Sequence, residues 1–182
     1  MADIRNLIDL VEAKSTQKLE LVPLPYGRDE LMPVMCKDTI NYHYGKLAKG
    51  YVDRYNAGEG DSDFNEAGAY LHNIFFPQLM PPRGGNKPVG NTLALITQKY
   101  GSFDKFQTEF AAAAMSIQGS GWIYLSRSGD IKTIKNHQIR KDILLLIDWW
   151  EHAWALGYQH DKARYLKNMW RIIDWTKVEA RL

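Results

Sequence analysis

Cysteine is almost absent from this 182-residue chain, which contains only Cys36. A single cysteine cannot form an internal disulfide, so we expect a reducing, cytoplasmic compartment and a fold stabilised by its core. Long apolar runs are also missing, since no stretch approaches the ~20 apolar residues of a membrane span. The first residues, MADIRNLIDLVEAKST, have neither a basic start nor a continuous apolar run, so we expect no secretory signal.

The chain also lacks an excess of charge of either sign. Lysine and arginine total 23 and aspartate and glutamate total 21, which gives a net charge of +2. This balance argues against a nucleic-acid-binding protein and against a polybasic membrane anchor. Hydrophobic residues make up 45% of the chain, enough for a sizeable core. Aromatic residues make up 12%, and several of them lie near histidines.

The N-terminal part predicts a short extension followed by a helical hairpin. Residues 3–14 have apolar side chains at helical spacing and are followed by a polar tether, so we expect an extension over residues 1–20 whose helix docks on a partner. Apolar side chains recur at helical spacing again over residues 38–55 and 65–79. These two helices are expected to pair antiparallel, within a domain spanning residues 21–86.

A Pro/Gly-rich linker at residues 81–90 marks the boundary to a second domain, residues 87–182. Residues 90–100 predict one helix, and Ser102 is a plausible N-cap for the next. The apolar runs WIYLS, IKTIKN and ILLLID predict three short strands in an antiparallel meander. A single helix over residues 162–175 is expected to close the chain. The fold class is therefore α+β, a helical hairpin followed by an α/β domain with a three-stranded antiparallel sheet.

The segment Asp148-Trp149-Trp150-Glu151-His152 follows the third apolar run. A carboxylate at the end of a strand and an imidazole four residues later can converge on one metal ion when the chain turns between them. Alternatively, Asp148 caps a helix and His152 is an ordinary half-buried histidine.

The other histidines strengthen the metal hypothesis. His43 and His72 lie in the middle of the two hairpin helices and would face a common surface. With Asp148 and His152 they would supply three neutral nitrogens and one anionic oxygen, which suits manganese or iron better than calcium or magnesium. Zinc would be equally acceptable by composition, and each hairpin histidine could instead be a hydrogen-bonded core residue. His160 lies in a polar run and is expected to be exposed.

These landmarks resemble, in order, the iron/manganese superoxide dismutase family over about 160 residues. The matching motifs are LPY at 24–26, Tyr42-His43 with Tyr51 eight residues later, His72-Asn73, GSFDKF at 101–106, QGSGW at 118–122, DWWEHA at 148–153 and Asp174-Trp175.

The resemblance implies that the protein is an antioxidant enzyme converting superoxide to O2 and hydrogen peroxide. One manganese or iron ion per chain, held between the two domains, would cycle between M(III) and M(II). Glu151 would reach across a homodimer interface, or one in a dimer of dimers, to the partner's metal-binding histidine, which is His152 in this sequence. The implied ligands are His43, His72, Asp148 and His152; Tyr51 would line the substrate channel, and Trp122, Trp150 and, less closely matched, Phe64 would wall the metal pocket.

Some positions depart from the family pattern. The helix position that often carries a glutamine in the family is Gly68 in this sequence. The resemblance therefore implies that His137 forms the hydrogen bond to the metal-bound solvent. Alternatively, His137 is an ordinary turn residue. Leu47 and Ala155 replace a histidine and tyrosine that bond across subunits, and Lys162 replaces the usual arginine of the substrate funnel. These losses motivate an alternative, a structural or interaction module with a metal staple and reduced or no activity.

Overall fold

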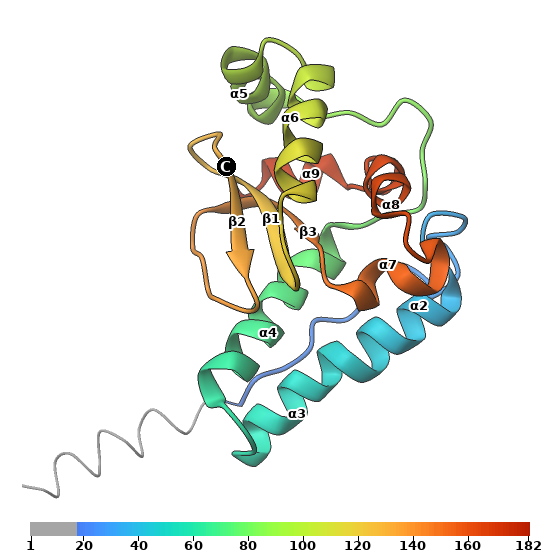
Figure 1. Cartoon of the computed structure of the whole chain (residues 1–182), viewed down its shortest axis with the longest axis vertical. Helices are drawn as coiled ribbons and strands as arrows, with labels where there is room; N and C mark the ends of the chain where they lie inside the picture. The colour runs from blue at the N-terminus through green and yellow to red at the C-terminus, as the bar shows by residue number, and fades with distance from the viewer. Residues whose placement is uncertain (1–17) are drawn as a thin grey trace, which may run out of the picture.

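The computed structural model describes residues 18–182, so the predicted helix over residues 3–14 lies outside the described residues. A hairpin of two long helical segments packs against an α/β domain, as Figure 1 shows. Both parts of the predicted architecture are therefore confirmed. The first arm of the hairpin is one continuous helical segment that changes its winding twice. It consists of α2 (Lys37–Tyr42), the π-helical turn η1 (His43–Ala48) and α3 (Lys49–Ala57).

The second arm is α4 (Ser62–Phe75), which continues into the short 3-10 turn η2 (Phe76–Gln78). The reversal between the arms has local causes. α3 ends at Gly58, whose φ of 67° is a left-handed conformation that glycine adopts without strain. The side chain of Asp61 then caps α4 by accepting a hydrogen bond from the Phe64 N–H at 2.8 Å. The turn therefore brings the two arms together antiparallel.

The three predicted strands form as expected, but their order does not make a meander. β1 (Gly121–Ser126) lies in the centre and pairs antiparallel with both β2 (Ile131–Lys135) and β3 (Ile143–Asp148). The meander prediction is therefore wrong, because it placed β2 in the middle. Every residue of β1 and β3 is buried, whereas β2 is largely exposed and carries two lysines. Lysines of this kind are typical of an edge strand, and that signal was present in the sequence.

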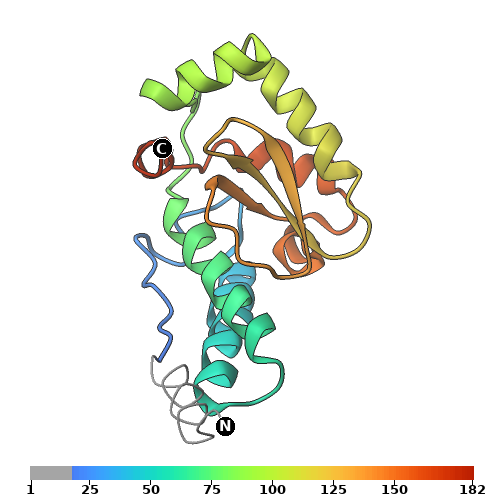
Figure 2. The ribbon, with the colours of Figure 1, turned by 90° about the vertical axis from the view of Figure 1, so that its left-hand side faces the viewer.

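Helices cover the sheet on the side away from the hairpin, as Figure 2 shows. α5 (Gly90–Tyr100) has the predicted bounds, and α6 (Phe103–Met115) packs against β1 and β2. The predicted N-cap is confirmed, since the Ser102 hydroxyl accepts a hydrogen bond from the Lys105 N–H at 3.2 Å. From the hairpin, α4 packs against β3. The α/β domain and the hairpin therefore share one core.

The C-terminal part contains three helices, α7 (Glu151–Tyr158), α8 (Lys162–Met169) and α9 (Trp175–Glu179). The prediction of one helix over residues 162–175 is wrong. The chain leaves the helix after Met169 so that Ile173 can form a β-bridge with Leu79, and Asp174 then caps α9. No helix within residues 18–182 has the length and apolar composition needed to cross a bilayer.

Candidate metal centre

The hairpin contributes two histidines from facing positions. His43 is the first residue of η1 and His72 lies near the end of α4, and both are fully buried. Their Nε2 atoms are 3.0 Å apart. The Nδ1 atom of His72 donates to the Gly68 carbonyl at 2.6 Å, so the proton is on Nδ1 and the Nε2 lone pair is available.

The π-helical turn η1 determines which other residue shares the face of His43. Eight residues of regular α-helix, at about 100° each, would place Tyr51 about 80° away from His43. A π-helical turn holds one extra residue, so the chain from His43 to Tyr51 covers the same rotation as seven residues of α-helix. The angle between the two side chains about the helix axis therefore falls to about 20°. The rings of Tyr51 and His43 accordingly both lie close to the ring of His72, with centroid distances of 5.5 Å and 5.0 Å to it. Wide turns of this kind often mark functional sites.

The α/β domain supplies the other two residues. Asp148 is the last residue of β3 and is fully buried, and His152 is in the first turn of α7. The Oδ1 atom of Asp148 accepts a hydrogen bond from the Trp150 N–H at 2.8 Å, which fixes the turn between strand and helix. The alternative that Asp148 caps a helix is wrong, because the N-cap of α7 is Trp150 and no side chain caps it. Asp148 instead orders the turn before α7, and its Oδ2 atom points toward the histidines.

The four residues converge on one point between the two parts of the fold. The Oδ2 atom of Asp148 lies 3.0 Å from Nε2 of His43, 3.6 Å from that of His72 and 3.4 Å from that of His152. One ligand atom from each residue lies within 4.8 Å of the others. The Oδ2 atom of Asp148 and the Nε2 atom of His152 are buried, and neither has a hydrogen-bond partner although the other atoms of the group lie close by. A cation at the centre would satisfy all four atoms, so these residues fit a metal ion.

The charge states of His43, His72 and Asp148 also suit a metal ion. Burial lowers the pKa of His43 and lowers that of His72 still further, so both imidazoles are neutral. Burial opposes ionisation of Asp148, but the nearby His152 and His43 outweigh it and hold the pKa of the carboxyl below its usual range. The set is thus three imidazole nitrogens and one carboxylate, which is consistent with one manganese or iron ion.

Aromatic side chains enclose the centre together with His137. Trp122 in β1 is fully buried, with its ring 5.0 Å from that of His72. Its indole Nε1–H donates to Nδ1 of His137 at 3.1 Å, and His137 stacks on Trp150 with 4.5 Å between ring centroids. Phe64 lies 4.7 Å from His137. The structure therefore brings all three predicted wall residues and His137 to one place.

The hydrogen bond from Trp122 fixes the tautomer of His137. An indole N–H can only donate, so Nδ1 of His137 accepts and the proton of the neutral ring is on Nε2. That nitrogen is buried and has no hydrogen-bond partner, in a residue that is 6% exposed. Burial lowers the pKa of His137 to about 4, so the ring is neutral at pH 7. His137 therefore presents an unpaired N–H donor within the aromatic enclosure.

Gly68 leaves space for the ring of Tyr51. A Cβ atom on Gly68 would lie 2.8 Å from Cγ of Tyr51, closer than any ordinary carbon contact. The ring of Tyr51 also lies 4.8 Å from His137, and burial raises the pKa of its hydroxyl to about 12. The family resemblance identifies Gly68 only by the absence of a glutamine. Its packing role depends on the distance between the two hairpin arms, which no sequence pattern shows.

The remaining predicted residues lie around the centre. Glu151 is exposed at the start of α7, next to His152, whose side chain is 13% exposed. The ammonium group of Lys162 lies 5.1 Å from the ring of Trp154 and 5.9 Å from that of Trp149. Leu47 and Ala155 are both half-buried, and His160 is exposed as predicted.

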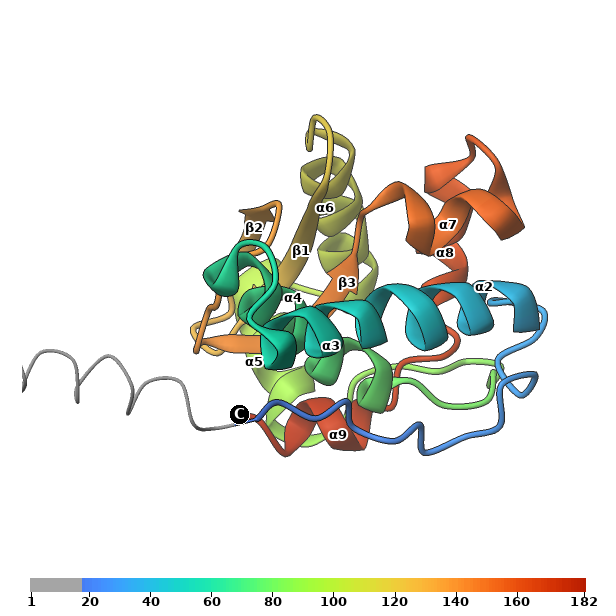
Figure 3. The same ribbon diagram turned by 90° about the horizontal axis from the view of Figure 1, so that it is seen from below.

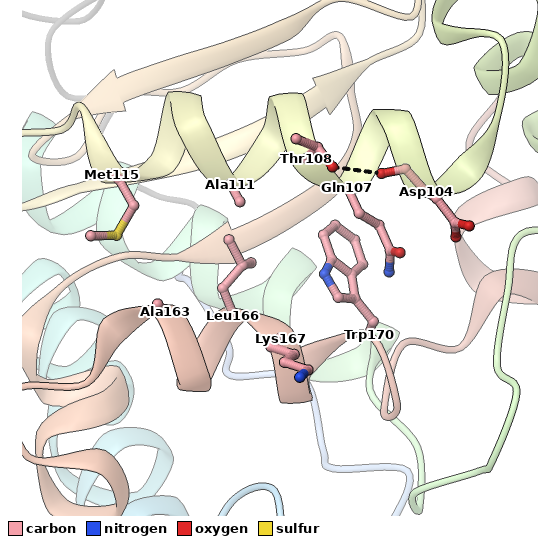
Figure 4. Close-up of a pocket in the computed structure, with 9 residues that line it drawn as sticks. All are labelled: Asp104, Gln107, Thr108, Ala111, Met115, Ala163, Leu166, Lys167 and Trp170. Carbon is pink, nitrogen blue, oxygen red and sulfur yellow. Dashed lines mark hydrogen bonds between the residues drawn. The ribbon is translucent and has the colours of Figure 1, made fainter.

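A groove of about 580 Å³ lies between α6 and α8, away from these residues (Figure 4). None of the four ligand residues lines it, and neither Tyr51 nor His137 does. The groove is therefore no part of the metal centre. Its lining residues are Asp104, Gln107, Thr108, Ala111, Met115, Ala163, Leu166, Lys167 and Trp170.

Comparison with known proteins gives a consistent result. Residues 88–181 match the model of the C-terminal domain of iron/manganese superoxide dismutases, and residues 18–64 match that of their alpha-hairpin domain. A superoxide dismutase [Mn/Fe] from Porphyromonas gingivalis is 39% identical, over 89% of this chain and 98% of its own length. A superoxide dismutase [Fe] from Pyrobaculum aerophilum is 35% identical, over 92% of this chain and 93% of its own length. The mitochondrial superoxide dismutase [Mn] of Schizosaccharomyces pombe is also 35% identical, over 100% of this chain and 94% of its own length.

Proposed function

The chain belongs to the iron/manganese superoxide dismutase family, and on that premise we propose that its reaction takes place at the centre formed by His43, His72, Asp148 and His152. The family converts two superoxide anions and two protons to O2 and hydrogen peroxide. The observation that carries the assignment is the convergence of four buried ligand atoms within 4.8 Å of one another, two from each part of the fold.

A bound manganese or iron ion supplies the electron exchange, since it can alternate between two oxidation states. The protein orients two of the four ligand side chains through its own backbone. Gly68 orients His72 through its carbonyl, and Asp148 is fixed by the Trp150 N–H. Preorganised ligands of this kind raise affinity and restrict the geometry available to the ion.

We assign two polar side chains to the handling of small molecules in the cavity. The unpaired Nε2–H of His137 can donate a hydrogen bond to a solvent or substrate oxygen there. The hydroxyl of Tyr51, with its pKa raised to about 12, stays protonated at pH 7 and can also donate. Trp122, Trp150 and Phe64 exclude bulk water, which strengthens both hydrogen bonds.

Lys162 is proposed to attract the anionic substrate. Its ammonium group makes no ion pair with a carboxylate in residues 18–182, so its charge is not neutralised by a neighbour. The faces of Trp154 and Trp149 hold the cation in place, as cation–π contacts do. With a net charge of +2 for the whole chain, the attraction acts over short range.

We further propose a homodimer, or a dimer of dimers, in the cytoplasm. Support for the dimer comes from Glu151, which is exposed on the single chain directly beside His152 and has no partner for its carboxylate among the hydrogen bonds and ion pairs of residues 18–182. A second subunit would supply that partner through its own His152. The single cysteine, Cys36, supports a reducing compartment.

The assignment is tested by elemental analysis and a superoxide-consumption assay on the same purified sample. We expect about one manganese or iron ion per chain, as one His3Asp centre requires, together with high activity. Bound metal without activity would contradict the proposal and support a structural module, the reading that the family comparison does not favour. His43→Ala should lose the metal, and Glu151→Ala should lower the mass measured by light scattering.

A further inference from the structure

Residues 18–26 form an extended segment, here called the strap, that runs along the hairpin without belonging to a helix or sheet; Figure 3 shows it in blue beneath the hairpin. Two asparagines hold its backbone. Asn56 accepts from the Leu19 N–H and donates to the Leu19 carbonyl, both at 2.8 Å. Asn73 accepts from the Val22 N–H and donates to the Glu20 carbonyl, also both at 2.8 Å. Each amide thus pairs with the strap as a neighbouring strand would.

The two anchors come from different arms of the hairpin, Asn56 from α3 and Asn73 from α4. The hydroxyl of Tyr44 adds a third attachment from η1, by donating to the Val22 carbonyl at 2.9 Å. The strap is therefore tied to both arms, and its position depends on both.

Leu19 and Leu21 lie on the same side of the extended strap, since side chains alternate along such a backbone. Both pack against a small hydrophobic cluster formed by Tyr51, Val52 and Ala69, which is separate from the main core. The strap therefore closes a cluster that contains the tyrosine beside the metal centre.

Tyr51 has one side in this cluster and the other in the candidate site. Its ring lies 5.5 Å from His72 and 4.8 Å from His137. Gly68 lies directly against the ring, and the guanidinium of Arg54 lies 5.0 Å from its centre. The leucines of the strap pack against the cluster to which this ring belongs.

We propose that Leu19 and Leu21, held by Asn56 and Asn73, are positioning residues that keep Tyr51 against His72 and His137. The inference rests on the proposed function, because it gives the strap a part in the same reaction. Loosening the strap allows the ring to shift while the four ligand residues keep their contacts. Turnover should then fall without loss of metal.

The test uses the full-length, metal-loaded protein with Asn56→Ala and Asn73→Ala, singly and together. Asn86→Ala is the matched control, since Asn86 also makes two amide hydrogen bonds, to the Trp170 and Ile173 carbonyls, away from Tyr51. Metal content, kcat and KM are measured, and the accessibility of Tyr51 is measured by its rate of nitration with tetranitromethane, followed by peptide mass spectrometry.

We expect the double variant to keep its metal, to lose about tenfold in kcat with a smaller change in KM, and to nitrate several-fold faster at Tyr51. Asn86→Ala should match the wild type in all four measurements. Unchanged nitration and kcat in the double variant would overturn the inference; if that variant does not fold, the same criterion applies to the single variants and to Leu21→Ala. Nitration does not depend on turnover, so an inactive wild type would contradict the proposed function without deciding the role of the strap.

Discussion

Replacing Gly68 by alanine should destabilise the protein although it adds a better helix former. In an open helix, Gly→Ala is favourable by up to about 1 kcal/mol. At Gly68 the new Cβ would lie 2.8 to 3.0 Å from three ring carbons of Tyr51, whereas carbon atoms prefer about 3.5 to 4.0 Å. The ring would have to move by roughly 1 Å, against His72 and His137, and overpacking of this kind costs about 1 to 3 kcal/mol.

Gly157 in α7 provides the control, because a Cβ there would meet nothing within 4 Å. Gly157→Ala has the same gain in helix propensity, so the difference between the two variants isolates the contact with Tyr51. For a chain of this size, 1 to 3 kcal/mol corresponds to a difference in Tm of about 2 to 12 °C. Calorimetry at equal metal content measures it, and a displaced Tyr51 should also lower turnover, by up to about 100-fold. If Gly68→Ala matched Gly157→Ala in Tm and in activity, the proposed contact would be wrong.

Three further predictions concern acidity, helix capping and the metal. Burial lowers the pKa of His137 from 6.5 to about 4, so the unfolded state takes up this proton first and the folded state loses up to about 3 kcal/mol as the pH falls from 6.5 to 4. His137→Gln should remove this part of the dependence on pH of the free energy of unfolding, as measured by urea unfolding at several pH values. An equal dependence on pH in the variant and the wild type would refute the prediction. The carboxylate of Glu179 accepts hydrogen bonds from two N–H groups at the start of α5 and from the Thr92 hydroxyl, so Glu179→Ala should lower the free energy of unfolding, a loss that an unchanged urea midpoint would exclude. Removing the metal with a chelator should lower Tm, because a metal that binds only the folded state stabilises it. Adding zinc should restore Tm but not activity, since zinc does not change oxidation state. Recovered activity with zinc would contradict the proposed chemistry.

The convergence of four potential metal ligands could be predicted because each of them has a local signature. Asp148 and His152 are four residues apart at the end of an apolar run, and His43 and His72 lie on two helices that a short turn makes antiparallel. The hairpin and the three strands follow from the spacing of apolar residues for the same reason.

Other features could not be predicted because they depend on contacts between distant residues. Asn56 and Asn73 bind the backbone of the strap, and a side chain that bonds to backbone imposes no pattern on the residues it binds. The break between α8 and α9 depends on the bridge from Ile173 to Leu79, which lies in the other half of the chain. The central position of β1 differs from the prediction for another reason, because a meander has the same strand order in space as along the chain and this sheet does not.

The π-helical turn η1 has a consequence for how the length of this chain can vary. With the turn, His43 and Tyr51 are eight residues apart and share one face of the helix. In a regular α-helix, the same two side chains would have to be seven residues apart to lie within about 20° of each other, which is the same arrangement. Deleting one residue within 44–48 would thus convert the wide turn to regular α-helix and keep the tyrosine on the ligand face. Insertions and deletions of one residue at this place are absorbed by the hydrogen-bonding pattern of the helix, so chains of unequal length can retain the same centre.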